Sequence, residues 1–399
     1  MSSRTWRLRL AAGVVALLTL GGLALAPARA HRSSSLLDGL LGRYIVTLDD
    51  SVADPAGAAR RQTGLLGGTV DRVFNTALKG YSASLPQALL SGLLSDPLVR
   101  SVEPDRTVKL SATQFDPPYG VDRVDQRELP LSRSYTYTTG GVGVRAYVID
   151  TGTRRDHPEF LNRVAPGYNV FDGSSNAFDC NGHGTHVSGI VGSSTYGVAK
   201  GVTIVPVKIF GCADTTTLSA IIAGLDWATA DHRPGQAAVA NLSLTGSGAS
   251  AALDRAVTSL SNDGVAMAVA AGNDRADACS GSPSRVPQVL TVAATDVSDA
   301  MARFSNGGPC VDLFAPGVRI VSADLRTNGS RVISGTSMAA PFVAGALARE
   351  LGQGGTTSQQ AQSRVVDSAT TGRVTGIETR CGLLIGCRSV TANRLLFTG

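Results

Sequence analysis

Ser334-Gly335-Thr336-Ser337-Met338-Ala339-Ala340-Pro341 is the stretch around which the rest of the chain is organised. Small residues crowd Ser337, and an apolar, alanine-rich run follows, which predicts a tight turn that opens a helix. The unpaired N–H groups of a helix start and the dipole of the helix suit a developing oxyanion. A serine hydroxyl is a poor nucleophile alone, so this interpretation requires a base and an orienting carboxylate elsewhere in the chain.

Both partners occur upstream. Val148-Ile149-Asp150 ends an apolar run with a carboxylate, which is where a parallel strand delivers a side chain to a site. Asn181-Gly182-His183-Gly184-Thr185 places a histidine between glycines at the head of another helical pattern. We predict that Ser337 is the nucleophile and that His183 acts first as general base and then as general acid. Asp150 would fix the imidazole tautomer and stabilise its charged form.

The order Asp, His, Ser separates these motifs from the chymotrypsin and α/β-hydrolase arrangements. Residues 112–399 resemble the subtilisin-like serine peptidases, especially the secreted proteinase K and aqualysin group. The resemblance implies an α/β fold with a doubly wound, mostly parallel sheet, and hydrolysis of peptide bonds in proteins through an acyl-enzyme on Ser337. It also implies that Asn273 is the oxyanion donor beside the Ser337 N–H; losing one such donor costs about 3–4 kcal/mol. We expect a monomer without an organic cofactor.

Substrate-binding residues are also implied by the resemblance: a strand edge that pairs with the substrate backbone, and a glycine beside Asn273. They are Ser243, Leu244, Thr245, Gly246 and Gly272. The family usually has glycine where Thr245 stands, and Asp214-Thr215-Thr216 replaces a glycine-containing segment on the facing loop. Both changes add side chains where the backbone should approach closely. A second interpretation is therefore a non-catalytic relative, a binding or inhibitory module whose cleft is obstructed at Thr245 and Asp214.

From residue 142 onward, apolar runs alternate with helical patterns, and this alternation independently favours an α/β fold. Short apolar runs predict strands buried on both faces. These runs are 143–149, 202–209, 238–244, 265–270 and 289–293. Helical patterns cover 216–229 and 250–262, with others after His183 and Ser337. No internal repeat and no additional C-terminal domain is evident.

Residues 1–30 have the composition of a signal peptide, because a basic start precedes an apolar run over 11–26 and the small-x-small sequence Ala28-Arg29-Ala30. We therefore expect a secreted, extracellular protein with no membrane anchor after processing. The net charge is +5, but the arginines that supply most of the basic side chains are scattered. A solvated surface explains them better than nucleic-acid binding.

Residues 31–111 predict a small α+β (ferredoxin-like) domain that resembles the inhibitor-type propeptide of this peptidase group. Strand patterns lie at 43–48, at 73–74 with 81–85, at 99–103 and at 107–110, and a helical pattern lies at 87–95. The propeptide would act as intramolecular chaperone and inhibitor, and we expect cleavage between Ser111 and Ala112. The alternative is an ordinary N-terminal domain without an inhibitory role.

Six cysteines in an exported chain favour three disulfides, for which fifteen connectivities are possible. The resemblance to aqualysin-like enzymes implies the pairs Cys180–Cys212 and Cys279–Cys310, and Cys381 and Cys387 remain to close a short loop. A zinc site at Cys180, His183 and His186 is the competing interpretation. We disfavour it, because Cys180 has a better partner and no glutamate follows the first histidine.

Calcium is the one metal that the resemblance implies. In the proteinase K-like group, carbonyls at the positions of Pro287 and Val289 and an aspartate at the position of Asp312 hold one ion. Ca²⁺ accepts carbonyl, carboxylate and water oxygens together, so the residue types are suitable. The alternative is that Asp312 only organises the turn before Pro316.

Overall fold

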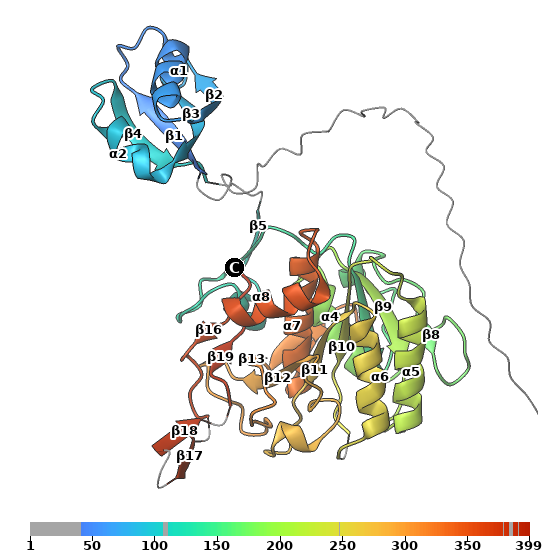
Figure 1. Ribbon diagram of the computed structural model, residues 1–399. Coiled ribbons are helices and arrows are strands. Elements are labelled where there is room, and N and C mark those ends of the chain that lie inside the picture. The colour runs from blue at the N-terminus through green and yellow to red at the C-terminus, as the bar shows by residue number, and fades with distance from the viewer. Residues whose placement is uncertain (1–40, 107–110, 247, 378, 383–385, 390) are drawn as a thin grey trace, which may run out of the picture. The chain divides into compact units, whose positions relative to one another are not determined.

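The computed structural model describes residues 41–106, 111–246, 248–377, 379–382, 386–389 and 391–399 (Figure 1). The chain divides into two compact units, Met1–Val108 and Lys109–Gly399. The predicted signal peptide, residues 1–30, and the predicted strand at 107–110 lie outside the described residues. Among the helices of the described residues, none has the length and apolar character needed to cross a membrane.

The first unit is a four-stranded antiparallel sheet in the order β2-β3-β1-β4, with the chain order βαββαβ of a ferredoxin-like domain. Its elements are β1 (Leu41–Leu48), α1 (Pro55–Leu65), β2 (Thr69–Phe74), β3 (Gly80–Pro86), η1 (Gln87–Leu89), α2 (Leu90–Leu94) and β4 (Val99–Pro104). Buried side chains of β1 and β3, including Val46, Leu48 and Tyr81, form its core with Ala58 and Ala59 of α1.

Two details of this unit differ from the sequence-based expectation. The single strand predicted from 73–74 and 81–85 is two strands, β2 and β3, because the chain reverses between them and pairs Phe74 with Gly80. Helix α1 was not predicted, since its sequence has two glycines and no clear apolar period. Asp54 caps this helix by accepting from the Gly57 N–H, and Pro55 occupies its first turn, a start signal that could have revealed it.

The second unit contains a nine-stranded sheet in the order β16-β19-β13-β12-β11-β10-β7-β9-β8. The strands along it are β16 (Thr370–Thr371), β19 (Arg394–Leu395), β13 (Leu313–Pro316), β12 (Leu290–Thr295), β11 (Ala266–Ala270), β10 (Ala238–Leu242), β7 (Arg145–Asp150), β9 (Thr203–Lys208) and β8 (Tyr168–Asn169). Every neighbouring pair is parallel except β16 with β19. The predicted doubly wound, mostly parallel sheet is confirmed, and all five predicted strands lie in it.

Helices cover both faces of this sheet (Figure 1). They are α3 (Tyr119–Val124), α4 (His183–Gly192), α5 (Leu218–Asp231), α6 (Ala251–Asn262), α7 (Thr336–Leu351) and α8 (Ser358–Ser368). Alternate residues of β7 point to opposite faces of the sheet. Val148 packs in the cluster with α4 and α7, whereas Tyr147 and Ile149 pack with α5 and α6. The central positions of these strands are therefore mostly apolar, which is why they read as nearly continuous apolar runs in the sequence.

Short hairpins and 3₁₀ turns complete the second unit. They are β5 (Ala112–Phe115) with β6 (Ser134–Tyr137), β14 (Ile320–Ala323) with β15 (Ser330–Ile333), β17 (Thr379–Gly382) with β18 (Gly386–Ser389), and the turns η2 (Pro158–Phe160) and η3 (Ala278–Ser280). Strand β5 begins at Ala112 and pairs within the second unit.

Two disulfides confirm the pairing implied by the resemblance. Cys180 and Cys212 are bonded with their Cα atoms 5.0 Å apart, and Cys279 and Cys310 with theirs 5.3 Å apart. Cys381 stands directly opposite Cys387 in the register of β17 and β18. The side chains of this last pair lie outside the described residues, so their disulfide stays a prediction.

Candidate active site

The predicted catalytic residues meet at the carboxyl edge of the parallel strands. Asp150 is the last residue of β7, Ser243 directly follows β10, and Asn273 follows β11 by three residues. His183 and Ser337 belong to the first turns of α4 and α7. In a doubly wound sheet, this edge is where ligands bind, so the fold brings together residues that are up to 187 positions apart, from Asp150 to Ser337.

Asp150 and His183 form the charged half of the site. His183 Nδ1 lies 2.8 Å from Asp150 Oδ1 and 3.0 Å from Oδ2, and the Thr151 N–H donates to Oδ1 at 2.7 Å. Asp150 is 1% exposed, whereas the side chain of His183 is 29% exposed. Burial lowers the pKa of His183, but the charge and hydrogen bond of Asp150 outweigh it, so the net shift raises this pKa.

Asp179 is a buried carboxylate of the site that the sequence analysis missed. Its Oδ1 accepts from the Thr151 hydroxyl at 2.8 Å and from the N–H groups of Asn181 and Gly182 at 2.9 and 3.0 Å. Its Oδ2 accepts from the N–H and the hydroxyl of Thr185 at 2.9 and 2.6 Å. Asp179 therefore ties the end of β7 to the start of α4. An aspartate just before a predicted helix start was the signal that could have revealed it.

Ser337 and Ser243 exchange two hydrogen bonds. The Ser337 hydroxyl donates to the Ser243 carbonyl at 3.1 Å, and the Ser243 hydroxyl donates to the Ser337 carbonyl at 2.7 Å. Between Ser337 and His183, both of which the structure describes, no hydrogen bond is formed. Catalytic hydrogen bonds often close only when substrate is bound, and attack requires the Ser337 hydroxyl to turn from Ser243 to His183 Nε2.

Asn273 is oriented by the residue before Ser337. Its Oδ1 accepts from the Thr336 N–H at 2.9 Å and from the Thr336 hydroxyl at 3.0 Å. The same hydroxyl accepts from the Gly272 N–H at 3.1 Å. Because both bonds use Oδ1, the Nδ2 amide of this exposed side chain is left to donate elsewhere.

A cavity of about 540 Å³ opens beside His183 and Ser337. Its walls include Thr151, Asn181, Phe210, Asp214, Thr215, Thr216, Leu218, Ile221, Ser243, Leu244, Thr245 and Gly246. Asp214 accepts from Asn181 Nδ2 at 2.7 Å, so it forms part of a wall, and Thr245 is exposed at the rim. The open cavity beside His183 and Ser337 favours the catalytic interpretation over the alternative of a cleft obstructed at Thr245 and Asp214.

The expected substrate-binding stretch lies along this cavity, with one restriction. The Gly246 N–H already donates to the Ser282 carbonyl at 2.9 Å, so this group cannot pair with a substrate backbone unless that bond breaks. Gly272 adopts φ +108°, in the region that favours glycine, and a side chain there would collide with Asn306.

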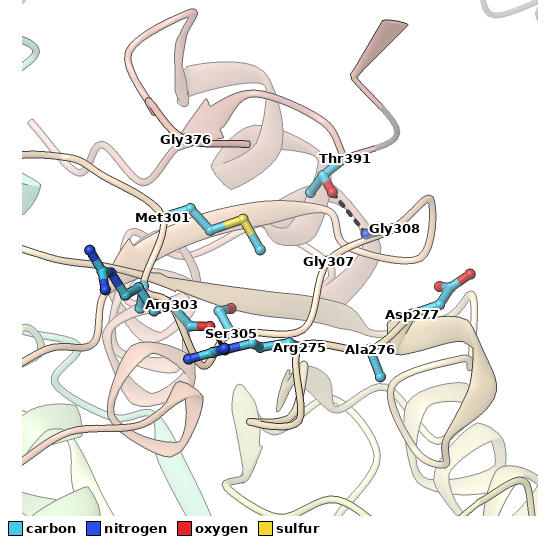
Figure 2. A pocket seen from close by; sticks show the side chains of 11 residues that line it. Arg275, Ala276, Asp277, Met301, Arg303, Ser305, Gly307, Gly308, Gly376 and Thr391 are labelled. Atoms are coloured by element: carbon cyan, nitrogen blue, oxygen red, sulfur yellow. Dashed lines mark hydrogen bonds between the residues drawn. The ribbon is translucent and has the colours of Figure 1, made fainter. Parts of the chain in front are cut away.

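A second cavity, of about 500 Å³, contains none of the predicted catalytic residues (Figure 2). Arg275, Ala276 and Asp277 line it from the loop that carries Asn273, and 301–308 contribute Met301, Arg303, Ser305, Gly307 and Gly308. The lining of this second cavity begins two residues beyond Asn273 in the chain, at Arg275.

Asp312 is the one carboxylate among the residues expected to bind calcium. Burial raises its pKa to about 6, although the Thr291 N–H and the charge of Arg394 lower it in part. Its Oδ2 accepts from the Thr291 N–H at 2.7 Å, whereas Oδ1 has no hydrogen bond to any residue that the structure describes. The described residues hold no group of three or more His, Cys, Asp or Glu side chains suited to a metal. A site at Asp312 would thus depend on backbone carbonyls such as those of Pro287 and Val289, and this donor set fits Ca²⁺.

The alternative zinc site does not form. Cys180 is bonded to Cys212, and His183 Nδ1 faces Asp150. His186 is buried, with Nε2 3.1 Å from the carbonyls of Ile320 and Arg331. These three side chains are therefore committed to other partners.

An aspartate, a histidine and a serine in this chain order at the edge of a doubly wound sheet define a serine hydrolase with a subtilisin-type site. The sequence model of the subtilase family matches residues 141–383, and that of peptidase inhibitor I9 matches residues 43–111. The chain belongs to the subtilase family, and an inhibitor-type segment precedes its subtilase domain.

Individual relatives agree with this assignment. An extracellular serine proteinase of Thermus sp. (strain Rt41A) is 49% identical over 306 residues, which are 75% of this chain and 74% of that protein. Alkaline serine exoprotease A of Vibrio alginolyticus is 45% identical over 79% of this chain and 60% of its own length. The solved structure of a cold-adapted subtilisin-like serine proteinase superposes with a TM-score of 0.66 at 44% identity, over 71% of this chain and 99% of that one.

Proposed function

We propose that this chain is the precursor of a secreted serine endopeptidase that hydrolyses peptide bonds in proteins through an acyl-enzyme on Ser337. The observation that carries the proposal is the Asp150–His183 pair, of which His183 borders the same open cavity as Ser337. An imidazole and a serine hydroxyl at one accessible pocket, with a buried carboxylate behind the imidazole, are the groups that acyl transfer requires.

Each residue has a distinct role in this reaction. His183 takes the proton of the Ser337 hydroxyl as Ser337 attacks the substrate carbonyl, and it later returns the proton to the leaving amine. Asp150, through its contact with Nδ1, leaves Nε2 to face Ser337 and stabilises the imidazolium. The Nδ2 amide of Asn273 and the Ser337 N–H stabilise the oxyanion of the tetrahedral intermediate.

The substrate backbone extends along Ser243, Leu244 and Thr245, with Gly272 on the opposite side. Extended peptides gain affinity by pairing with an exposed strand edge, and selectivity then depends on the side chains that line the cavity. Thr245 and the segment Asp214-Thr215-Thr216 in this lining depart from the family pattern, so the side-chain preference of this enzyme cannot be copied from its relatives.

The N-terminal region serves processing and export. Residues 1–30 direct secretion, and residues 31–111 act as chaperone and inhibitor until the enzyme cuts between Ser111 and Ala112. The match to peptidase inhibitor I9 ends at residue 111, and β5 of the second unit begins at Ala112. The two disulfides are typical of proteins that leave the reducing cytosol. The extracellular Thermus relative supports the same destination.

Calcium has a structural role in this proposal. Asp312 with the carbonyls of Pro287 and Val289 would hold the ion, which would neutralise the buried carboxylate. Binding to the folded chain alone stabilises it by mass action. Catalysis itself depends on the side chains described above.

A fluorophosphonate probe, which reacts only with an activated serine, tests the proposed function. The mature wild type should be labelled at Ser337, whereas His183→Ala should label far more slowly because the base is lost. Ser334→Ala is the matched control, since Ser334 lies three residues away and its hydroxyl accepts from the Arg319 N–H. An unlabelled wild type that folds normally would exclude the proposed function.

A further inference from the structure

The loop that carries Asn273 lies against the loop 301–308, with the cavity of Figure 2 between parts of the two. Where the cavity intervenes, apolar packing cannot hold the Asn273 loop in place. Its position therefore depends on hydrogen bonds across the gap. Backbone bonds join Arg275 to Phe304 and Ala276 to Gly307, but both lie beyond Asn273 in the chain.

Asn306 makes the connections next to Asn273 itself. Its Oδ1 accepts from the N–H groups of Asp274 and Ala276, both at 2.9 Å, and its Nδ2 donates to the Ala271 carbonyl at 3.0 Å. The side chain is buried, and the residue is 7% exposed. One amide thus holds the chain both before and after Asn273, without touching the reacting atoms.

The backbone of Asn306 adds a further restraint. Its N–H donates to the Gly272 carbonyl at 2.9 Å. A Cβ on Gly272 would lie 2.3 Å from Asn306 Nδ2, so this glycine allows the side-chain amide to approach. On the other side of the loop, Thr336 holds Asn273 Oδ1. Asn273 is therefore held between Thr336 and Asn306.

We propose that Asn306 is a positioning residue for oxyanion stabilisation: it fixes the backbone on both sides of Asn273, so that Nδ2 of Asn273 meets the oxyanion. This inference rests on the proposed function, because it assigns the oxyanion to Asn273. Such a residue should affect the transition state more than substrate binding, since the developing oxyanion depends on accurate donor placement.

A double-mutant cycle on the mature enzyme tests this role. Asn306→Ala should lower kcat by roughly 10- to 100-fold, the range expected when a catalytic group is displaced by up to about 1 Å, with KM changed little. Affinity for a peptide boronate, which mimics the tetrahedral intermediate, should fall in parallel. In the Asn273→Ala background, Asn306→Ala should cause almost no further loss, because the donor that it positions is absent.

Asn393→Ala is the matched control. Asn393 holds Val374 in the same manner, donating to its carbonyl at 2.8 Å and accepting from its N–H at 2.9 Å. Asn393→Ala should lower the melting temperature and leave kcat unchanged. In a double-mutant cycle, it should show no coupling to Asn273→Ala. Should Asn306→Ala fail to fold, Asn306→Asp keeps the acceptor for Asp274 and Ala276 and replaces the donor to Ala271 by a carboxylate oxygen. It also adds a negative charge, and any effect of this charge that does not depend on Asn273 persists in the Asn273→Ala background, so the same cycle separates it.

Two results would overturn the inference. One is an equal loss of kcat from the Asn306 substitution with and without Asn273, and the other is unchanged kcat in a folded Asn306 variant. Both are measured relative to an active wild type that fluorophosphonate labels. An unlabelled wild type would instead refute the proposed function, so the two failures are distinguishable.

Discussion

Both carboxylate oxygens of Asp150 face a single ring nitrogen of His183, at 2.8 and 3.0 Å from Nδ1. Burial lowers the pKa of His183, whereas Asp150 raises it strongly and the charges of Asp179 and Asp214 raise it further, so the net shift is upward. Catalysis needs the neutral imidazole as base. Activity should therefore be lost as the pH falls through this raised pKa.

Asp214→Asn should extend activity to lower pH. Removing a negative charge disfavours the imidazolium, so the pKa of His183 falls and the acid limb of the kcat/KM profile moves down in pH. The amide oxygen can still accept from Asn181. Because Asp214 is exposed, added salt should shrink the difference from wild type. Asp226→Asn, an exposed substitution on α5, is the control and should not move the limb; a shift to higher pH for Asp214→Asn would contradict the argument.

Ser337→Ala should accumulate as an uncleaved precursor, because we expect the peptidase to cut its own junction near Ser111–Ala112. Mass spectrometry of the protein from a protease-free expression system gives the chain length directly. Ser334→Ala, with its hydroxyl removed only three residues away, should mature normally. Mature-size Ser337→Ala protein would show that another peptidase does the processing.

The isolated segment 31–111 should inhibit the mature enzyme in trans. Its described part forms a complete four-stranded sheet with its own core, and its sequence matches peptidase inhibitor I9. Initial rates of peptide hydrolysis at micromolar segment should fall. The same segment ending at residue 106 should inhibit less, since it lacks the residues next to the cleavage site. Equal rates with and without the full segment would count against the inhibitory role.

Cys381 and Cys387 should form the third disulfide. The two residues are directly opposed in β17 and β18, and a bond between them would close a loop of a few residues. Peptide mapping without reduction should recover this pair together with Cys180–Cys212 and Cys279–Cys310. Free thiols at these two positions in native protein would refute the prediction.

Calcium should remove a pH-dependent loss of unfolding free energy that arises from the burial of Asp312. The pKa of this carboxyl is raised from 3.8 to about 6 in the folded state, so between these values the folded chain binds more protons than the unfolded chain. The unfolding free energy should therefore fall as the pH rises from about 4 to about 6 in EDTA, by roughly 1.4 kcal/mol per unit of pKa shift at most. Millimolar calcium should offset that loss.

Melting temperatures of enzyme inactivated by a fluorophosphonate, which prevents autolysis, measure this effect. Asp312→Asn should melt lower than wild type in calcium and should show a smaller gap between calcium and EDTA samples. Asp324→Asn is the control, because Asp324 also accepts from a backbone N–H, that of Thr327. Identical melting of wild type in calcium and in EDTA would exclude a consequential site.

The central strands and the catalytic motifs could be predicted because their signals are local. A strand buried on both faces, such as 145–150, is apolar at its four central positions, a glycine-rich motif surrounds His183, and a motif of small residues surrounds Ser337. The edge strand β16 and its neighbour β19 were not predicted, since strands of two residues carry no periodic pattern. Helix α8 was also missed, although Thr357 and Gln360 form a capping box at its start.

The sequence by itself determined which residues we propose for the chemistry, because nucleophile, base and carboxylate each require one residue type in one local setting. Only the tertiary structure decided how they are held. The side chains of Asp179, Asn306 and Ser243 hold the site through hydrogen bonds to groups that are distant in the chain. Hydrogen bonds between distant residues leave no local pattern in the sequence. Whether the cleft is open also depended on the fold, since cavity volume is set by how the loops pack.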